Sequence, residues 1–183
     1  NTRESIYNAF RRKETFGTSG PRIKVRFFAG YNFENSNLND QDLIQEAYSK
    51  NVPMGGDIIQ EKGKNPRFLV WAISDPLGAP LQRVQIIKGW LADGEQREKV
   101  FDVACSDGQS VNPLNHRCPD NGAKVNLDDC SISREKGNAE IKTFWQDPEF
   151  SNDQEAFYYA RVLENPTCRW STWDAVRAEE KPR

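Results

Sequence analysis

The sequence predicts a mostly β domain: an antiparallel β-sandwich of about six or seven strands, with an N-terminal helix and one short additional helix. Two observations predict this fold class. Short segments of alternating or continuous apolar residues recur along the chain, and turn-forming Gly, Pro, Asn or Asp residues separate them. The chain has 183 residues, of which 37% are hydrophobic and 28% charged, so it can build one sizeable core.

The first element is a helix predicted over residues 1–14. Asn1 is its candidate N-cap, with Glu4 three residues later, which is the spacing of a capping box. The stretch 16–21 contains Gly and Pro and ends the helix, because both residues favour backbone states that a helix cannot continue. The apolar stripe of this helix, at positions i, i+3 and i+4, consists of Ile6, Ala9 and Phe10.

The remaining elements follow from the same kind of pattern. In residues 22–27 apolar side chains alternate with Arg and Lys, as in a strand with one buried face. A short helix is predicted over 39–49, capped by Asn39 or Asp40. Residues 68–73 are apolar throughout, as a central strand buried on both faces would be. Further strands are predicted over residues 81–90, 100–104, 139–145 and 156–163.

Four cysteines indicate the redox environment. Three of them fall in a loop-rich stretch, residues 105–131, where disulfides would hold a long excursion in an oxidising compartment. Two disulfides are expected, at least one of them within this stretch, and the sequence does not choose among the three pairings. The alternative is four reduced, buried thiols. The candidate residues are Cys105, Cys118, Cys130 and Cys168.

The charge balance and hydropathy narrow the choice of partners. The net charge is −2, with 25 basic residues against 27 acidic ones, so we expect no nucleic-acid partner. No apolar run approaches the roughly 20 residues that span a bilayer, so we expect no membrane partner.

Candidate chemistry is scarce. The only histidine, His116, lies in the excursion, and no two cysteines form a C-x-x-C pair, so a zinc site or a Ser-His-Asp triad has little support. We therefore expect no catalytic, cofactor-binding or metal-binding residue in this chain. Acidic loop residues such as Asp107 and Asp128 match no EF-hand spacing and are interpreted as turn residues. Five tryptophans leave a carbohydrate-binding module as an alternative, although Trp71 and Trp145 lie in strands and are expected in the core.

Several separated stretches resemble a known family: residues 3–6, 11–23, 81–90, 145–150 and 157–172. They resemble the C-terminal third of a bacterial family of large exported proteins known only as a domain of unknown function. The N-terminal part of that family resembles the PHP (polymerase and histidinol phosphatase) superfamily of metal-dependent phosphoesterases. The resemblance implies a divalent metal only in a missing upstream domain, and a periplasmic or secreted location.

The resemblance also implies how the chain is divided. Residues 1–20 would be the end of the upstream barrel-like domain or a linker helix, residues 21–176 the β-sandwich accessory domain, and residues 177–183 a flexible tail. The chain opens without an initiator Met or an apolar leader, so we expect it to be a C-terminal part of a longer protein.

These observations give one leading functional hypothesis and its alternatives. The leading hypothesis is a non-catalytic accessory domain that docks on the upstream hydrolase-like domain of the same chain. Without that domain, the apolar stripe would either pack on a second copy, as a weak homodimer, or fold back on the sandwich incompletely covered. The docking candidates are Ile6, Phe10 and Phe16. In an enzyme alternative, three residues contact an anionic substrate of the parent hydrolase: Arg161, Glu164 and Arg169.

Overall fold

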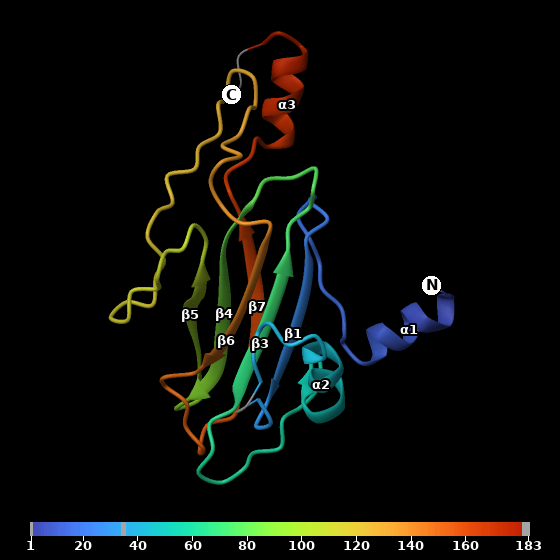
Figure 1. Ribbon diagram of the computed structural model, residues 1–183, viewed down its shortest axis with the longest axis vertical. Coiled ribbons are helices and arrows are strands. Elements are labelled where there is room, and N and C mark those ends of the chain that lie inside the picture. The colour runs from blue at the N-terminus through green and yellow to red at the C-terminus, as the bar shows by residue number, and fades with distance from the viewer. Residues whose placement is uncertain (1, 34–35, 181–183) are drawn as a thin grey trace.

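The computed structural model describes residues 2–33 and 36–180, and it shows two antiparallel sheets packed face to face (Figure 1). The predicted mostly β fold, with seven strands and an N-terminal helix, is confirmed. The elements are α1 (Arg3–Arg11), β1 (Lys24–Gly30), α2 (Leu43–Lys50), β2 (Val52–Pro53), β3 (Arg67–Ile73), β4 (Leu81–Ala92), β5 (Glu95–Cys105), β6 (Glu140–Gln146), β7 (Ala156–Glu164) and α3 (Trp170–Arg177).

The strand order leaves one side of the sandwich open. The first sheet has the order β2-β1-β3-β6 and the second has the order β5-β4-β7, with every neighbouring pair antiparallel. Strand β2 covers β1 over only two residue pairs, and β7 ends the second sheet. The edges of β1 and β7 therefore lie on the same open side, and β7 presents unpaired backbone groups there.

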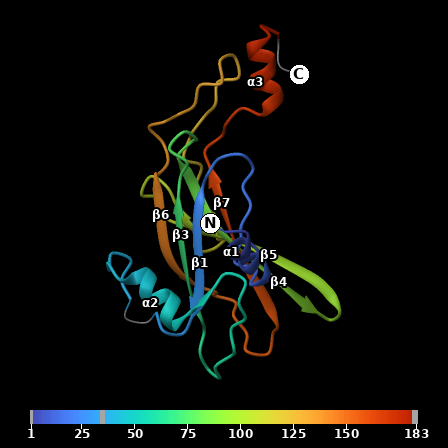
Figure 2. The same ribbon diagram turned by 90° about the vertical axis from the view of Figure 1, so that its right-hand side faces the viewer.

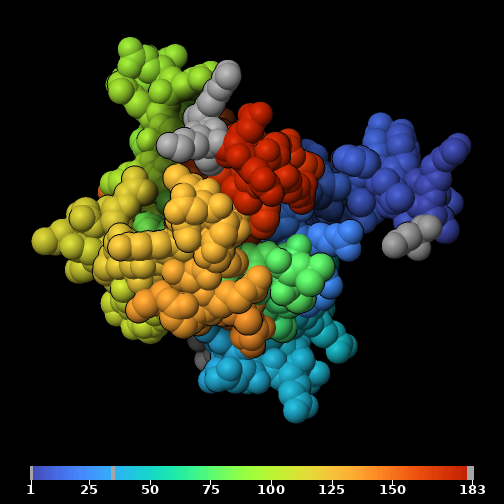
Figure 3. Space-filling model, turned by 90° about the horizontal axis from the view of Figure 1, so that it is seen from above, coloured from blue at the N-terminus to red at the C-terminus, as the bar shows by residue number. Residues whose placement is uncertain are grey.

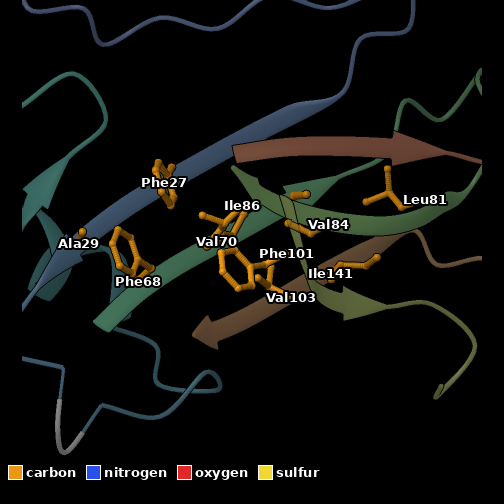
Figure 4. Close-up of a cluster of buried hydrophobic side chains, with 11 residues drawn as sticks. Phe27, Ala29, Phe68, Val70, Leu81, Val84, Ile86, Phe101, Val103 and Ile141 are labelled. Carbon is orange, nitrogen blue, oxygen red and sulfur yellow. The ribbon is translucent and has the colours of Figure 1, made fainter. Parts of the chain in front are cut away.

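The main core fills the space between the sheets (Figure 4). Strand β3 points Phe68, Val70 and Ala72 inward, and the second sheet meets them with residues such as Ile86 and Phe101. Burying each large apolar side chain contributes roughly 1.5–3 kcal/mol before the entropy cost of folding, so this cluster is the main source of stability.

A second apolar cluster lies on the outer face of the first sheet, where α2 packs (Figure 2). Leu43 and Ala47 of α2 contact Phe28 and Leu69, which explains why residues 68–73 are apolar on both faces. The helix begins later than predicted. The carboxylate of Asp40 accepts the Asn37 N–H at 2.8 Å, so the predicted caps belong to a turn before the helix.

Helix α1 extends away from the sandwich (Figures 1 and 3). Thr2 is its N-cap, because the Thr2 hydroxyl oxygen accepts the Ser5 N–H at 3.1 Å. The predicted cap, Asn1, lies outside the described residues. The helix ends at Arg11, and Lys13 then adopts a left-handed backbone conformation with φ of 57°.

Two disulfides hold the long excursion between β5 and β6, which confirms the predicted number and the expectation that at least one lies within the excursion. Cys105 pairs with Cys118 at the base of the excursion, and Cys130 pairs with Cys168, which follows β7. Directly after Cys168 comes α3, a helix where the sequence predicted only sandwich and tail. Periodic Trp170, Trp173 and Arg177 gave too short an amphipathic signal to distinguish a helix from a chain end.

Trp71 and Trp145 were both predicted to lie in the core, and the structure confirms this for only one of them. Trp145 packs against the inter-sheet core, with its ring 5.2 Å from that of Phe101. For Trp71 the prediction is wrong: its ring is partly exposed beside the cations of Arg26 and Lys142, at 5.6 and 4.6 Å. Strand alternation is the reason, because Val70 and Ala72 take the inward positions.

Candidate functional site

The N-terminal helix exposes an apolar face on the open side of the sandwich. Ile6, Phe10 and Phe16 are 53%, 65% and 51% exposed, and Tyr7, beside Ile6 on the helix, is also exposed. No residue of α1 is buried. Within one chain this apolar face is therefore uncovered. Its apolar side chains are nevertheless gathered on one side of the helix, as in helices that pack against another part of a protein.

The exit of α1 is fixed to the body of the domain. The backbone of Arg12 and Lys13 lies against Gly55, where a Cβ atom would collide with the Arg12 carbonyl oxygen. Gly55 also has φ of 88°, a backbone conformation that favours glycine. Both the lack of space and the backbone angle therefore require a glycine at this position. The Tyr48 hydroxyl donates to the Glu14 carboxylate at 3.3 Å, and burial followed by the Glu14 charge raises the pKa of Tyr48. The helix is thus presented from an anchored base.

A cleft of about 980 Å³ opens beside this base, between the edges of β1–β2 and β7. Its walls include Phe16, Met54, Ile58 and Tyr158, so the exit of α1 and the inter-sheet core both contribute to it. Of the predicted docking residues, Phe16 lines this cleft, whereas Ile6 and Phe10 on α1 do not.

A buried ionic cluster closes one end of the core near the cleft. The Lys88 ammonium donates to the Asp147 carboxylate and to the Glu149 carbonyl, at 2.7 and 2.8 Å, and both charged side chains are almost fully buried. The Tyr158 hydroxyl donates to the same carboxylate at 2.7 Å. Burial, and then the hydrogen bond and charge of Asp147, raise the pKa of Tyr158. Because every polar group here has a partner, the cluster joins the two sheets and offers no free base or nucleophile.

A second polar network lies on the outer face of the second sheet. The Asp102 carboxylate is buried, and it accepts hydrogen bonds from Gln85 at 2.6 Å, from Arg83 at 3.0 Å and from the Cys118 N–H at 2.7 Å. Arg161 continues the network by donating to Gln85 at 2.8 Å. Sequence reasoning missed Asp102 and Gln85, although a polar residue alternating with Phe101 and Val103 in a strand was a usable signal.

A third network anchors the excursion to the sandwich. The Asn121 amide donates to Asp107, Ser106 and Asn165, at 3.1, 3.2 and 2.9 Å, and Asp107 also accepts the Gly137 N–H. Burial alone would raise the pKa of Asp107, but the hydrogen bonds from Ser106, Gly137 and Asn121 outweigh it and lower that pKa. Asp107 was predicted to be a solvated turn residue. Its carboxylate instead accepts hydrogen bonds that hold the excursion to the sandwich.

The structure separates the three residues of the enzyme alternative. Arg161 and Glu164 lie three residues apart on β7, so strand alternation points them to opposite faces. Burial and the nearby Asp75 charge raise the pKa of Glu164, although the Ala79 N–H donates to it. Arg169 is the N-cap of α3, beyond the end of the strand. None of the three side chains lines the cleft between β1–β2 and β7.

Within 2–33 and 36–180, no group of three or more His, Cys, Asp or Glu side chains is arranged to hold a metal ion. Over the same ranges, no helix has the length and apolar composition needed to cross a bilayer.

Comparison with known proteins identifies the family. No curated protein and no solved structure matches the chain. One family model matches, described as "Protein of unknown function (DUF3604)", and the match covers residues 1–183. The chain therefore belongs to the DUF3604 family of proteins of unknown function.

Proposed function

We propose that this chain is a non-catalytic accessory domain that docks on an upstream, metal-dependent hydrolase-like domain of the same polypeptide. One observation carries the proposal: α1 is anchored at its exit but leaves the apolar face formed by Ile6, Tyr7 and Phe10 exposed. We call this face, together with Phe16, the docking face.

The energetics of a short helix support a missing partner. Helix α1 has nine residues, and isolated helices shorter than about 12–15 residues are marginal in water. Covering Ile6 and Phe10 would contribute roughly 1.5–3 kcal/mol each, which is enough to stabilise the helix in a complex. The anchored base also limits the entropy lost on docking.

An upstream partner fits the place of α1 in the chain. A domain joined just before α1 would be held beside the docking face at a high effective concentration, so a modest apolar contact would suffice. The resemblance to a family with a PHP-like N-terminal part supports a metal-dependent hydrolase as that domain. The two disulfides support an oxidising, periplasmic or secreted location.

The enzyme and carbohydrate alternatives have less support. Arg161 and Glu164 are three residues apart on β7 and so point to opposite faces of the strand, and Arg169 lies beyond its end, at the start of α3. Of the tryptophans, Trp170 and Trp173 are the exposed ones, and they lie on α3 and not on a sheet face where a sugar-binding groove would form.

A binding experiment tests the docking proposal. The upstream part of the gene product and this chain are produced separately, and their association is measured by calorimetry. We expect saturable binding that weakens at least about tenfold in Ile6→Asp and Phe10→Asp, since each loses an apolar contact worth over about 1.4 kcal/mol.

The control is Leu114→Asp, which places the same charge at a leucine on the excursion that is even more exposed than Ile6 and Phe10. Its affinity should equal that of the wild type. Absence of binding, or equal weakening by all three substitutions, would contradict a docking role for α1. A metal and phosphoesterase assay adds a second check: the upstream part, and not this chain, should bind the metal and turn over substrate.

A further inference from the structure

A row of polar side chains crosses the outer face of the second sheet. The strand register places Gln85 opposite both Asp102 on β5 and Arg161 on β7. Their sequence neighbours, such as Val84 and Ile86, pack in the inter-sheet core, so these three side chains face outward.

The centre of this row is rigid and buried. Asp102 is 2% exposed and Gln85 is 6% exposed. The Gln85 amide bridges Asp102 and Arg161, because it donates to the Asp102 carboxylate and accepts from the Arg161 Nε–H. Arg83 donates to the other Asp102 oxygen at 3.0 Å. Buried acceptors with several donors hold their partners in one geometry, so the Arg161 guanidinium is positioned before any ligand arrives.

A second exposed guanidinium stands on the other side of the row. Arg117 is half-exposed, and its Nη1 lies 3.6 Å from Asp102. The next residue, Cys118, is held by its N–H bond to Asp102 and by the disulfide to Cys105. The covalent bond thus fixes the loop that carries Arg117.

The local charge is unbalanced in favour of cations. Three guanidinium groups, those of Arg83, Arg117 and Arg161, surround the single carboxylate of Asp102. The adjacent row of the sheet carries no charge, because it consists of Val100, Ile87 and Tyr159. Arg83 uses its Nε and Nη1 groups on Gln82 and Asp102, whereas the terminal nitrogens of Arg161 have no partner among the described residues.

Aromatic surface continues from Arg161 along the same face of β7. Tyr159 and Phe157 are 42% and 62% exposed, and their rings are stacked with centroids 6.3 Å apart. Gly89 makes room for the Phe157 ring, which would collide with a Cβ atom there. A cation beside two exposed rings suits a ligand with an anionic group and a ring.

We propose that this face is a binding site for a phosphate or sulfate ester. The oxyanion is taken by Arg117 and Arg161, and the ring of the ligand lies on Tyr159. Planar guanidinium forks match the geometry of tetrahedral oxyanions, and the buried Gln85 and Asp102 orient them. The site goes beyond the docking role and does not depend on it.

Phenyl phosphate is the probe that tests the site, with inorganic phosphate, phenyl sulfate and phenol as further arms. Binding is followed in the wild-type chain by NMR of the arginine Nε–Hε groups and by calorimetry. We expect saturable binding of phenyl phosphate, weaker binding of inorganic phosphate, and no binding of phenol. The phenyl sulfate arm decides which of the two esters is preferred.

Substitutions locate the binding on the molecule. Arg161→Gln and Arg117→Gln should each weaken phenyl phosphate binding by about tenfold or more, because each removes a charge-assisted contact. Arg97→Gln, an exposed arginine at the far end of β5, is the matched control and should bind like the wild type.

Three results would overturn the proposal. They are the absence of saturable phenyl phosphate binding to the wild type, equal loss in the Arg97 control, and phenol binding as tight as that of phenyl phosphate. The wild-type NMR titration decides the matter even if a variant fails to fold.

Discussion

Replacing Lys88 by methionine should destabilise the domain severely. The Lys88 side chain is 3% exposed and the Asp147 side chain is fully buried, so removing the ammonium leaves a carboxylate in the core without its counter-charge. Breaking a buried ion pair from one side costs about 3–5 kcal/mol. Methionine fills most of the lysine volume, so little of that cost comes from a cavity.

Two companion variants separate the charge effect from the loss of a hydrogen bond. Tyr158→Phe removes one O–H donor to the same carboxylate and should cost about 1.5–3 kcal/mol. The double variant Lys88→Met, Asp147→Asn should be more stable than Lys88→Met alone, because the uncompensated charge is gone.

Urea unfolding at pH 7 measures these free energies. Tryptophan fluorescence is a suitable signal, since Trp90 lies beside the Lys88 ammonium at 5.4 Å. If Lys88→Met costs less than about 1 kcal/mol, the pair is not a buried, mutually dependent unit and the reasoning fails.

Three further outcomes are expected. Glu164→Gln should raise the stability of the domain near pH 7 and leave it unchanged in acid, where Glu164 is protonated. Burial, and then the Asp75 charge, raise the pKa of Glu164 in the folded state, so its ionisation at higher pH costs stability. Equal gains at both pH values in thermal unfolding would contradict this. Replacing both Cys130 and Cys168 by serine should cost about 1 kcal/mol more in urea than the same change at the other disulfide, because the closed loop spans 38 residues and not 13; a larger loss at the shorter loop would refute it. Gly89→Val should destabilise the sheet by displacing the Phe157 ring, and circular dichroism melting would show this as a lowered Tm; an unchanged Tm would mean that the ring moves freely.

Strand positions could be predicted from the sequence because hydrophobic period and turn residues act locally. The continuous apolar run from Phe68 predicted a strand buried on both faces, and the structure shows why: the inter-sheet core lies on one side and α2 on the other. Trp71 breaks this pattern: it is not part of the cluster that α2 forms with Leu69, and no local signal in the sequence reports that.

The polar networks could not be predicted, because they depend on contacts between distant segments. Asp102 meets Cys118 across the base of the excursion, and Lys88 meets Asp147 across two sheets. Neither pair has a characteristic spacing in the sequence. The excess of arginine around Asp102 likewise becomes visible only once β4, β5 and β7 lie side by side. The number of disulfides could be predicted from the cysteine count. Their pairing could not, because Cys130 meets Cys168 only where the chain between β7 and α3 approaches the excursion.

Hydrogen exchange at the amides of α1 tests the central claim, that this domain docks through its N-terminal helix, most directly. In the isolated chain, residues 3–11 should exchange fast, because a short uncovered helix opens readily, while β3 stays protected. In the product of the complete gene, the same amides should become protected at least about tenfold. If residues 3–11 are as protected in the isolated chain as β3, or remain fast in the complete protein, α1 is not a docking element.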